Sequence, residues 1–200
     1  MHQKKILFEI IPEGPLEKFF SLTEGMTSLE DANVLYELAK SVIDGCIVEV
    51  GAYRGQSTVA LGRGSIDGHR VPVFTIEPHE IFTGIYGGEF GPSDRGSFYK
   101  AMLDSGCYHV VRLLNASSEL ISCNWDKEIS LLWIDGDHTH EGVNRDFDCW
   151  HPFLKKNAIV AFDDSTDPAI GPYHLVQRLA AFGEYKLLNT TLKINVLQRL

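Results

Sequence analysis

The chain has 200 residues, enough for one domain with a full core, and its 44% apolar and 22% charged residues are ordinary for a folded protein. A formal charge of −9 argues against a sequence-independent nucleic-acid binder but leaves room for cationic cofactors and metal ions. No run of residues reaches membrane-spanning length, Glu9 interrupts the first apolar run, and the four cysteines lack metal-binding spacing. We therefore expect a cytoplasmic protein with reduced thiols, no nucleic-acid partner and no membrane contact.

Residues 1–43 are predicted to form an irregular arm followed by one helix. Prolines and glycines punctuate the first 26 residues, so the arm is a candidate cover for a site or for a second subunit in a homodimer. Ser28, with Asp31 three residues later, resembles a capping box and predicts a helix to about Ser41. Residues 44–200 are predicted to form the main part of the same single globular domain.

The main part is predicted to alternate strands with helices. Two further strands at the end are joined by Asn189-Thr190, and a link of two residues can only join antiparallel neighbours. The stretch 78–96 is glycine-rich, aromatic and irregular, which is typical of a functional loop. These patterns predict an α/β fold: a doubly wound, mostly parallel seven-stranded sheet with a C-terminal antiparallel hairpin. The predicted strands are 46–50, 71–76, 109–114, 129–134, 158–162, 185–188 and 192–197, with helices beginning near 57 and covering about 97–105, 143–150 and 173–182.

The turn after the first strand is the most informative stretch. Gly51 and Gly55 bracket Tyr53, and a helix opens near Ser57, so free backbone N–H groups face a ligand there. A dinucleotide motif requires a glycine where Tyr53 stands. Glu49 would repel a pyrophosphate, but it suits a ligand with an ammonium group and a positive sulfur. S-adenosylmethionine has both groups, whereas the alternative is a plain turn with a solvated Glu49.

Acidic residues also stand at the ends of other predicted strands. The C-terminal ends of parallel strands meet at one edge of the sheet, so these carboxylates would lie close together. They would repel each other unless a cation were present. Glu77 is placed to accept hydrogen bonds from ribose hydroxyls. Asp135, Asp163 and Asp164 offer oxygen ligands for a hard cation such as Mg²⁺, which lowers the pKa of a bound hydroxyl. The alternatives are solvated turn acids and an Asp pair that caps a helix.

His138, three residues after Asp135, is a candidate general base because its ordinary pKa lies near neutral pH. A hydrogen-bonded, inert histidine at a helix start is the alternative interpretation. Asp135 itself is expected to contribute to catalysis by holding the metal.

Together these residues resemble the class I S-adenosylmethionine-dependent methyltransferases, in particular the metal-dependent catechol O-methyltransferase type. The resemblance covers roughly 44–197, and the run 134–143 is more similar to bacterial relatives that act on antibiotic or polysaccharide sugars. It implies a Rossmann-like methyltransferase fold, a ribose contact at Glu77, an adenine contact at Ala116-Ser117 and metal ligands at Asp163-Asp164. The motifs that carry it are Val48-Glu49-Val50-Gly51-Ala52-Tyr53-x-Gly55-x-Ser57, Thr75-Ile76-Glu77, Ala116-Ser117, Ile134-Asp135 and Phe162-Asp163-Asp164.

Two positions depart from that family. The catechol type has a lysine base where His138 stands, which leaves the identity of the base open. Asn115 replaces a glycine that is common before Ala-Ser, which affects only adenine packing. The predicted cofactor-binding set is Glu49, Gly51, Tyr53, Gly55, Ser57, Glu77, Ala116, Ser117 and Asp135; the predicted metal ligands are Asp135, Asp163 and Asp164.

The resulting expectation is Mg²⁺-assisted O-methylation of a small hydroxylated acceptor: a sugar, a catechol or a polyketide. Three alternatives remain open. The first is a protein of the same fold that binds the cofactor without methyl transfer, and the second is an NAD-dependent oxidoreductase, against which Tyr53 and the trailing hairpin count. The third is a metal-dependent relative that catalyses hydroxylation or another reaction.

Overall fold

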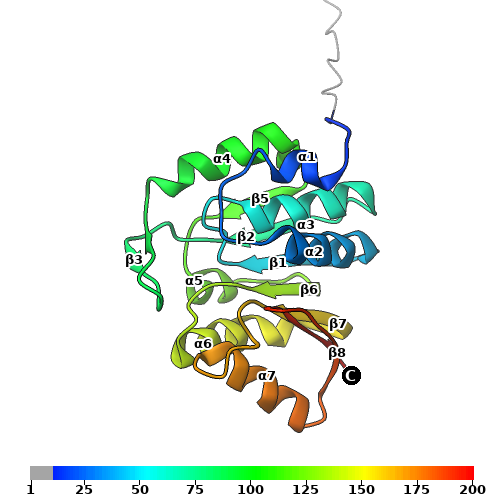
Figure 1. Ribbon diagram of the computed structural model, residues 1–200. Helices are drawn as coiled ribbons and strands as arrows, with labels where there is room; N and C mark the ends of the chain where they lie inside the picture. Colours follow the sequence, from blue (N-terminus) through cyan, green and yellow to red (C-terminus); the bar gives the residue numbers. More distant parts are fainter. Residues whose placement is uncertain (1–10) are drawn as a thin grey trace, which may run out of the picture.

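A seven-stranded sheet forms the centre of the computed structural model, which describes residues 11–200 (Figure 1). The strand order is β5-β2-β1-β6-β7-β9-β8; the first five strands are parallel, and β9 pairs antiparallel with both β7 and β8. This confirms the predicted mostly parallel sheet with its antiparallel C-terminal hairpin. The strands are β1 (Cys46–Val50), β2 (Val73–Ile76), β5 (Val111–Leu114), β6 (Ile129–Ile134), β7 (Leu154–Phe162), β8 (Tyr185–Thr190) and β9 (Asn195–Arg199).

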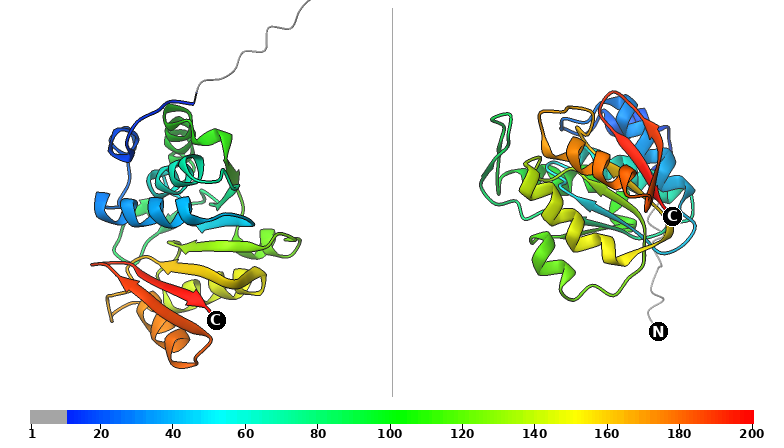
Figure 2. Two further views of the ribbon diagram at one scale, coloured as in Figure 1. Left: turned by 90° about the vertical axis from the view of Figure 1, so that its right-hand side faces the viewer. Right: turned by 90° about the horizontal axis from the view of Figure 1, so that it is seen from below.

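Helices cover both faces of the sheet, as Figure 2 shows from two further sides. One face carries α1 (Leu16–Phe20), α2 (Leu29–Ser41), α3 (Gln56–Asp67) and α4 (Asp94–Ser105). The other carries α5 (Ser118–Ser122), α6 (His140–Trp150) and α7 (Gly171–Ala181). The smaller elements are the 3₁₀ turns η1 (Cys107–His109) and η2 (His151–Phe153) and a separate hairpin of β3 (Phe82–Thr83) and β4 (Glu89–Phe90).

The strands divide their side chains between two hydrophobic cores. Ile47 packs in the core beneath α1–α4, whereas its neighbour Val48 packs in the core beneath α6 and α7. Trp133 and Leu132 on β6 divide in the same way. Because successive side chains of a strand point to opposite faces, Glu49 lies on the face of Ile47, beneath α3. The alternation of side chains along β1 therefore directs Glu49 toward α3.

The N-terminal helix packs on the same core as the rest of the domain. Asp31 N–H donates to Ser28 Oγ at 3.1 Å, which confirms the predicted cap of α2. Helix α2 lies so close to α3 that a Cβ atom on Gly64 would be 2.2 Å from the carbonyl oxygen of Tyr36. Phe19 on α1 is also in this core. Residues 1–10 of the predicted arm lie outside the described part of the chain.

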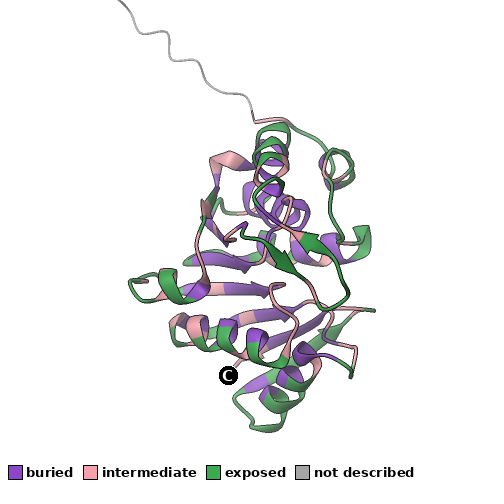
Figure 3. Cartoon of the chain, turned by 90° about the vertical axis from the view of Figure 1, so that its left-hand side faces the viewer, coloured by how far each residue is buried: buried purple, intermediate pink, exposed green. Residues whose placement is uncertain are grey.

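Several predicted boundaries differ from those of the structure. Asn189-Thr190 belongs to β8, and the turn comes at 191–194, where the Thr191 hydroxyl accepts hydrogen bonds from the N–H groups of Lys193 and Ile194. β7 begins at Leu154, four residues early, and the start of the third predicted strand is the turn η1. The stretch 78–96 is not wholly irregular, since it holds the exposed β3–β4 hairpin (Figure 3).

Two further expectations concern the whole chain. The four cysteines are free within residues 11–200, in agreement with the reduced thiols expected from their spacing. None of the helices in the same residues is long and apolar enough to cross a membrane.

Candidate active site

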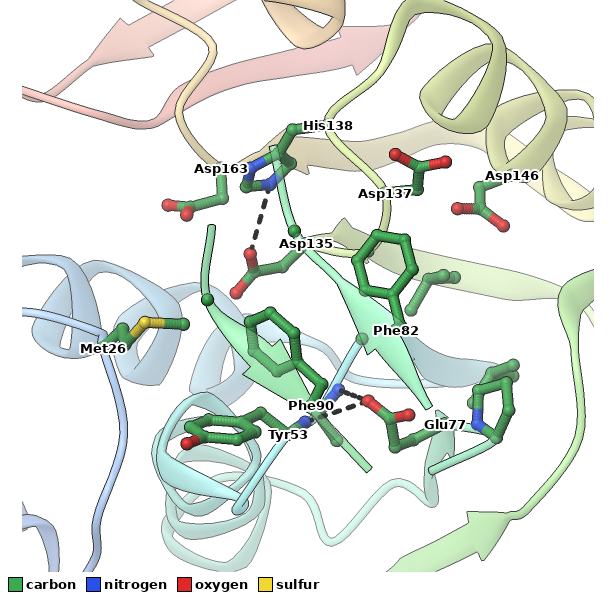
Figure 4. Close-up of a pocket in the computed structure, with 18 of the residues that line it drawn as sticks. Met26, Tyr53, Glu77, Phe82, Phe90, Asp135, Asp137, His138, Asp146 and Asp163 are labelled. Carbon is green, nitrogen blue, oxygen red and sulfur yellow. Dashed lines mark hydrogen bonds and ion pairs between the residues drawn. The ribbon is translucent and has the colours of Figure 1, made fainter. Parts of the chain in front are cut away.

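A cavity of about 530 Å³ lies at the carboxyl ends of the parallel strands. Acidic side chains, the glycine turn and the β3–β4 hairpin surround it (Figure 4). Glu49, Gly55 and Ala116 do not belong to its lining. The predicted site residues that line it are Gly51, Tyr53, Ser57, Glu77, Ser117, Asp135, His138, Asp163 and Asp164.

Residues 51–55 connect β1 to α3 and form the β1 turn, whose glycines allow close backbone packing. Gly51 has φ 84°, and a Cβ atom there would be 2.1 Å from the carbonyl oxygen of Asp135. The turn therefore passes directly against the end of β6. Gly55 has φ 91° and begins α3, with Phe98 of α4 packed against it. Gly55 does not line the cavity, so its predicted contact with a cofactor stays a prediction.

Glu49 supports the β1 turn from below and does not face the cavity. Its side chain is fully buried; the Ser57 hydroxyl donates to Oε1 at 2.6 Å, and the Thr58 and Thr75 hydroxyls donate to Oε2 at 2.6 and 2.7 Å. Burial raises the pKa of Glu49 to about 7, although the three hydroxyls oppose this shift. The predicted contact of Glu49 with a ligand is corrected: the carboxyl group holds the first turn of α3.

Glu77 faces the cavity while it also fixes the β1 turn. Its Oε2 accepts hydrogen bonds from the N–H groups of Ala52 and Tyr53 at 3.1 and 3.0 Å (Figure 4). Its Oε1 accepts one from His79 N–H at 2.8 Å. Oε2 thus accepts two hydrogen bonds and Oε1 only one, so Glu77 retains an acceptor site for a ligand at Oε1.

Asn115, which replaces the family's common glycine, joins the end of β5 to the end of β2. Its Nδ2 donates to the carbonyl oxygens of Glu77 and Pro78 at 2.7 and 2.8 Å. The chain then turns at Ala116, whose N–H donates to Leu114 O at 2.9 Å, and this brings Ser117 to the cavity in its place. Of the pair predicted to contact adenine, Ser117 lines the cavity and Ala116 does not.

Asp135, His138 and Asp163 form a group whose ligand atoms all lie within 4.8 Å of one another. His138 Nε2 is 3.4 Å from Asp135 Oδ1 (Figure 4). Asp164 does not join them in the way predicted, because its Oδ1 lies 3.0 Å from Lys193 Nζ and its Oδ2 lies 3.6 Å from His138 Nδ1. Of the predicted metal ligands, Asp135 and Asp163 therefore lie together beside His138, whereas Asp164 pairs with Lys193.

The charges of this group explain its unusual ionisation. Burial is the largest cause of the raised pKa of Asp163, and the negative charges of Asp135 and Asp164 raise it further. Burial also raises the pKa of Asp135. Burial alone would lower the pKa of His138, but contact with Asp135 and the charge of Asp164 outweigh it and raise the value. Such a group of close carboxyl groups retains a proton or binds a cation.

Several residues that line the cavity lie outside the predicted catalytic, cofactor and metal sets. Phe82 and Phe90 come from the hairpin, and Phe90 packs edge-on against Tyr53 with ring centres 5.0 Å apart. Met26 comes from the segment between α1 and α2. Asp146 lies on α6, and burial raises its pKa to about 6. The aromatic, glycine-rich composition of 78–96 indicated that Phe82 and Phe90 could line a site. Nothing in the helical pattern distinguished Asp146 from a solvent-exposed acid.

Comparison with known families decides the identity. Residues 48–165 match the model of a family described as a methyltransferase domain. The chain belongs to this methyltransferase family. The match spans the β1 turn, Glu77, the Asp135–His138 segment and Asp163, which are the features that line the cavity of the methyltransferase.

Solved structures of similar fold include cofactor complexes. The O-methyltransferase from Bacillus cereus in complex with SAH has a TM-score of 0.70 and 15% identity, covering 96% of this chain and 94% of that one. TomG from Streptomyces achromogenes, an O-methyltransferase of tomaymycin synthesis in complex with SAM, has a TM-score of 0.69 and 17% identity, covering 96% and 92%. SAH-bound PaMTH1 from Podospora anserina has a TM-score of 0.67 and 16% identity, covering 92% and 87%. At these identities the likeness shows that the methyltransferase shares their fold.

Proposed function

We propose that this methyltransferase transfers the methyl group of S-adenosylmethionine to a hydroxyl oxygen of a small acceptor, with the assistance of a divalent cation. The observation that carries the proposal is the convergence of Asp135, His138 and Asp163 in the same cavity as the β1 turn and Glu77. A cofactor site and a cation site in one cavity suit methyl transfer to a coordinated oxygen. The B. cereus and Streptomyces proteins, which are named as O-methyltransferases, support the choice of oxygen.

The residues present fit a divalent cation. Asp135 and Asp163 offer carboxylate oxygens, and the buried Nε2 of His138 has no hydrogen-bond partner within residues 11–200. Hard cations such as Mg²⁺ prefer carboxylate oxygens, and a positive ion would also remove the repulsion between the two acids. When bound, the cation would hold an acceptor hydroxyl and lower its pKa.

On the cofactor side, the chain supplies a carboxylate, a helix start and a polar turn. Glu77 is proposed to accept hydrogen bonds from the ribose hydroxyls, and Ser117 to contact the adenine. The start of α3 has no side-chain cap, so the N–H groups of its first turn, which contains Ser57, are proposed to bind the cofactor's carboxylate beside Gly51 and Tyr53. Glu49, Gly55 and Ala116 support these contacts indirectly.

His138 is proposed to accept the proton of the acceptor hydroxyl. Its imidazole lies between Asp135 and Asp164, which stabilise the imidazolium formed by proton transfer, and the contact between Asp164 and Lys193 holds Asp164 in place. In this arrangement, Asp164 orients the base instead of binding the cation.

The acceptor is proposed to have a flat, apolar body that carries the hydroxyl. Met26, Phe82, Ile85 and Phe90 line the cavity together with Tyr86, and aromatic side chains of this kind stack on rings. Among the acceptors considered from the sequence, this wall favours a phenolic or polyketide compound over a sugar.

Calorimetric titration of S-adenosylmethionine, with Mg²⁺ and after treatment with EDTA, tests the cofactor and the metal. Methyl transfer is then measured on 3,4-dihydroxybenzoate and on a methyl hexoside in the same buffers. We expect cofactor binding in both buffers, and transfer to the phenolic probe that EDTA abolishes and Mg²⁺ restores. Transfer that is insensitive to EDTA would remove the metal from the proposal, and binding without transfer to any hydroxylated probe would favour a binding protein. Stabilisation by NAD, but not by S-adenosylmethionine, would favour the oxidoreductase.

A further inference from the structure

Arg54 connects three separate walls of the cavity, and the proposed reaction gives it no role. Its Nε donates to Asp94 Oδ1 at 2.8 Å, and its Nη1 donates to Glu24 Oε2 at 2.7 Å. Its guanidinium carbon lies 5.0 Å from the centre of the Tyr53 ring. Glu24 belongs to the segment between α1 and α2, Asp94 begins α4, and Tyr53 belongs to the β1 turn, so one guanidinium joins three regions of the chain.

On one side, Arg54 reaches the hairpin through Asp94. Asp94 is buried, and its Oδ2 accepts a hydrogen bond of 2.9 Å from Gly91 N–H, directly after β4. The neighbouring Phe90 packs against Tyr53, and the Phe82 ring lies 5.9 Å from the Phe90 ring. The pair of Arg54 and Asp94 therefore fixes the returning end of the hairpin, and with it both aromatic walls.

On the other side, Arg54 and its neighbour Gln56 hold the segment that carries Met26. Thr27 N–H donates to Gln56 Oε1 at 3.0 Å. Gly25 lies so close that a Cβ atom there would be 2.6 Å from Gln56 Cβ. The ion pair with Glu24 is thus one of several contacts that hold this segment.

The two ion pairs of Arg54 differ in strength. The Glu24 side chain is 71% exposed, whereas that of Asp94 is 5% exposed. An exposed pair contributes little, but a buried carboxylate that loses its cation is costly. Removal of Arg54 therefore affects the hairpin more than the Met26 segment.

We propose that Arg54 is a positioning residue that shapes the acceptor side of the cavity by holding the β3–β4 hairpin and the Met26 segment against the β1 turn. The assignment of these walls to the acceptor rests on the proposed function. The mechanical part of the proposal depends only on contacts within the chain.

Hydrogen–deuterium exchange of the full-length protein tests the mechanical part without any substrate. In Arg54→Gln we expect exchange about tenfold faster in 80–92 and about threefold faster in 21–28, with α6 unchanged. Glu24→Gln removes only one ion pair and is expected to affect 21–28 alone. Arg54→Lys keeps a charge beside Asp94, so exchange in 80–92 returns toward the original rate. Lys100→Gln breaks a surface ion pair with Asp104 on α4 and serves as the matched control, with no change in either segment.

A second measurement separates positioning from a general structural role. For Arg54→Gln we expect the KM for 3,4-dihydroxybenzoate to rise about tenfold while the affinity for SAH, measured by calorimetry, stays within about threefold. Unchanged exchange in 80–92, or faster exchange throughout the chain together with an equal loss of SAH affinity, would overturn the proposal. If the original protein methylates no phenolic probe, the proposed acceptor is wrong, and the exchange rates still decide the role of Arg54.

Discussion

The two halves of the cavity rim use acids in opposite ways. On the β1–β2 half, Glu49 accepts three hydroxyl hydrogen bonds and Glu77 accepts three backbone ones. On the β6–β7 half, Asp135 and Asp163 lie beside His138, and only Asp164 has a lysine partner. Glu49 lies within β1, whereas the other four acids follow the ends of β2, β6 and β7. The donors around each carboxyl group decide whether it holds the backbone together or remains available for a cation and a proton.

The difference has a simple energetic origin. A buried carboxyl group that accepts several hydrogen bonds replaces its lost hydration, and it rigidifies the elements that supply the donors. Close carboxyl groups without such donors repel each other, which makes the site costly in the absence of a positive partner. The first arrangement holds the β1 turn and the start of α3, and the second leaves carboxyl groups available for a cation and a proton. The following substitutions test this division, from the largest expected effect on function to the smallest.

Asp163→Asn should decrease methyl transfer at least about a thousandfold, since the stabilisation supplied by a bound metal is worth several kcal/mol. The same change should increase the melting temperature at pH 8. The raised pKa of Asp163 means that the folded protein loses stability as pH rises from the ordinary aspartate value toward the folded one, and asparagine does not titrate. Initial rates and thermal melts at pH 5 and pH 8 measure both effects. A less stable variant at pH 8 would contradict the repulsion assigned to this half.

His138→Gln should decrease turnover about a hundredfold, which is typical for the loss of a general base. A base must be neutral, and the pKa of His138 is raised, so the rate of the original enzyme should climb as pH rises through a value above the ordinary histidine pKa. The variant should lose this rise while it binds SAH normally. His140→Gln, at an exposed position two residues away, is the control. Loss of Mg²⁺ binding in His138→Gln would make His138 a ligand instead of the base.

Glu77→Gln should weaken SAH binding about tenfold and decrease the free energy of unfolding by about 1–3 kcal/mol. The amide has one acceptor oxygen for the three N–H groups that the carboxylate serves, so one of them loses its partner. Calorimetry and urea unfolding provide the measurements, with the exposed Glu128→Gln as control. Unchanged affinity together with normal stability would show that Glu77 is dispensable in both roles.

Glu49→Gln should have the smallest effect on function, with SAH affinity within about threefold of the original because Glu49 has no access to the cavity. Its pKa is raised from 4.5 to about 7, so the folded form keeps a proton that the unfolded chain releases. The original protein should therefore lose stability between pH 4.5 and pH 7, by about 3 kcal/mol in full, and the variant should lack this loss. Denaturant unfolding at pH 5 and pH 8 compares them. A tenfold loss of SAH affinity would restore the direct contact first expected for Glu49.

Local patterns sufficed for much of the fold. β1 and β6 have the predicted bounds because each is a continuous apolar run between polar turns, and Ser28 caps α2 through a contact three residues away. The turn of the final hairpin was misplaced because the Thr191 hydroxyl makes a turn that backbone propensity does not reveal. In the site, the sequence identified the acids but not their partners.

The sequence by itself determined the order of strands and helices, the glycine turn and the acids at the strand ends, because these depend on neighbouring residues and on the period of a strand or helix. Only the tertiary structure decided that Glu49 faces α3, that Asp164 pairs with Lys193, and that Arg54 joins Glu24 to Asp94. Each of these depends on a contact between residues far apart in the chain or on which layer covers a given face. No local pattern specifies such partners, because folding alone brings them together.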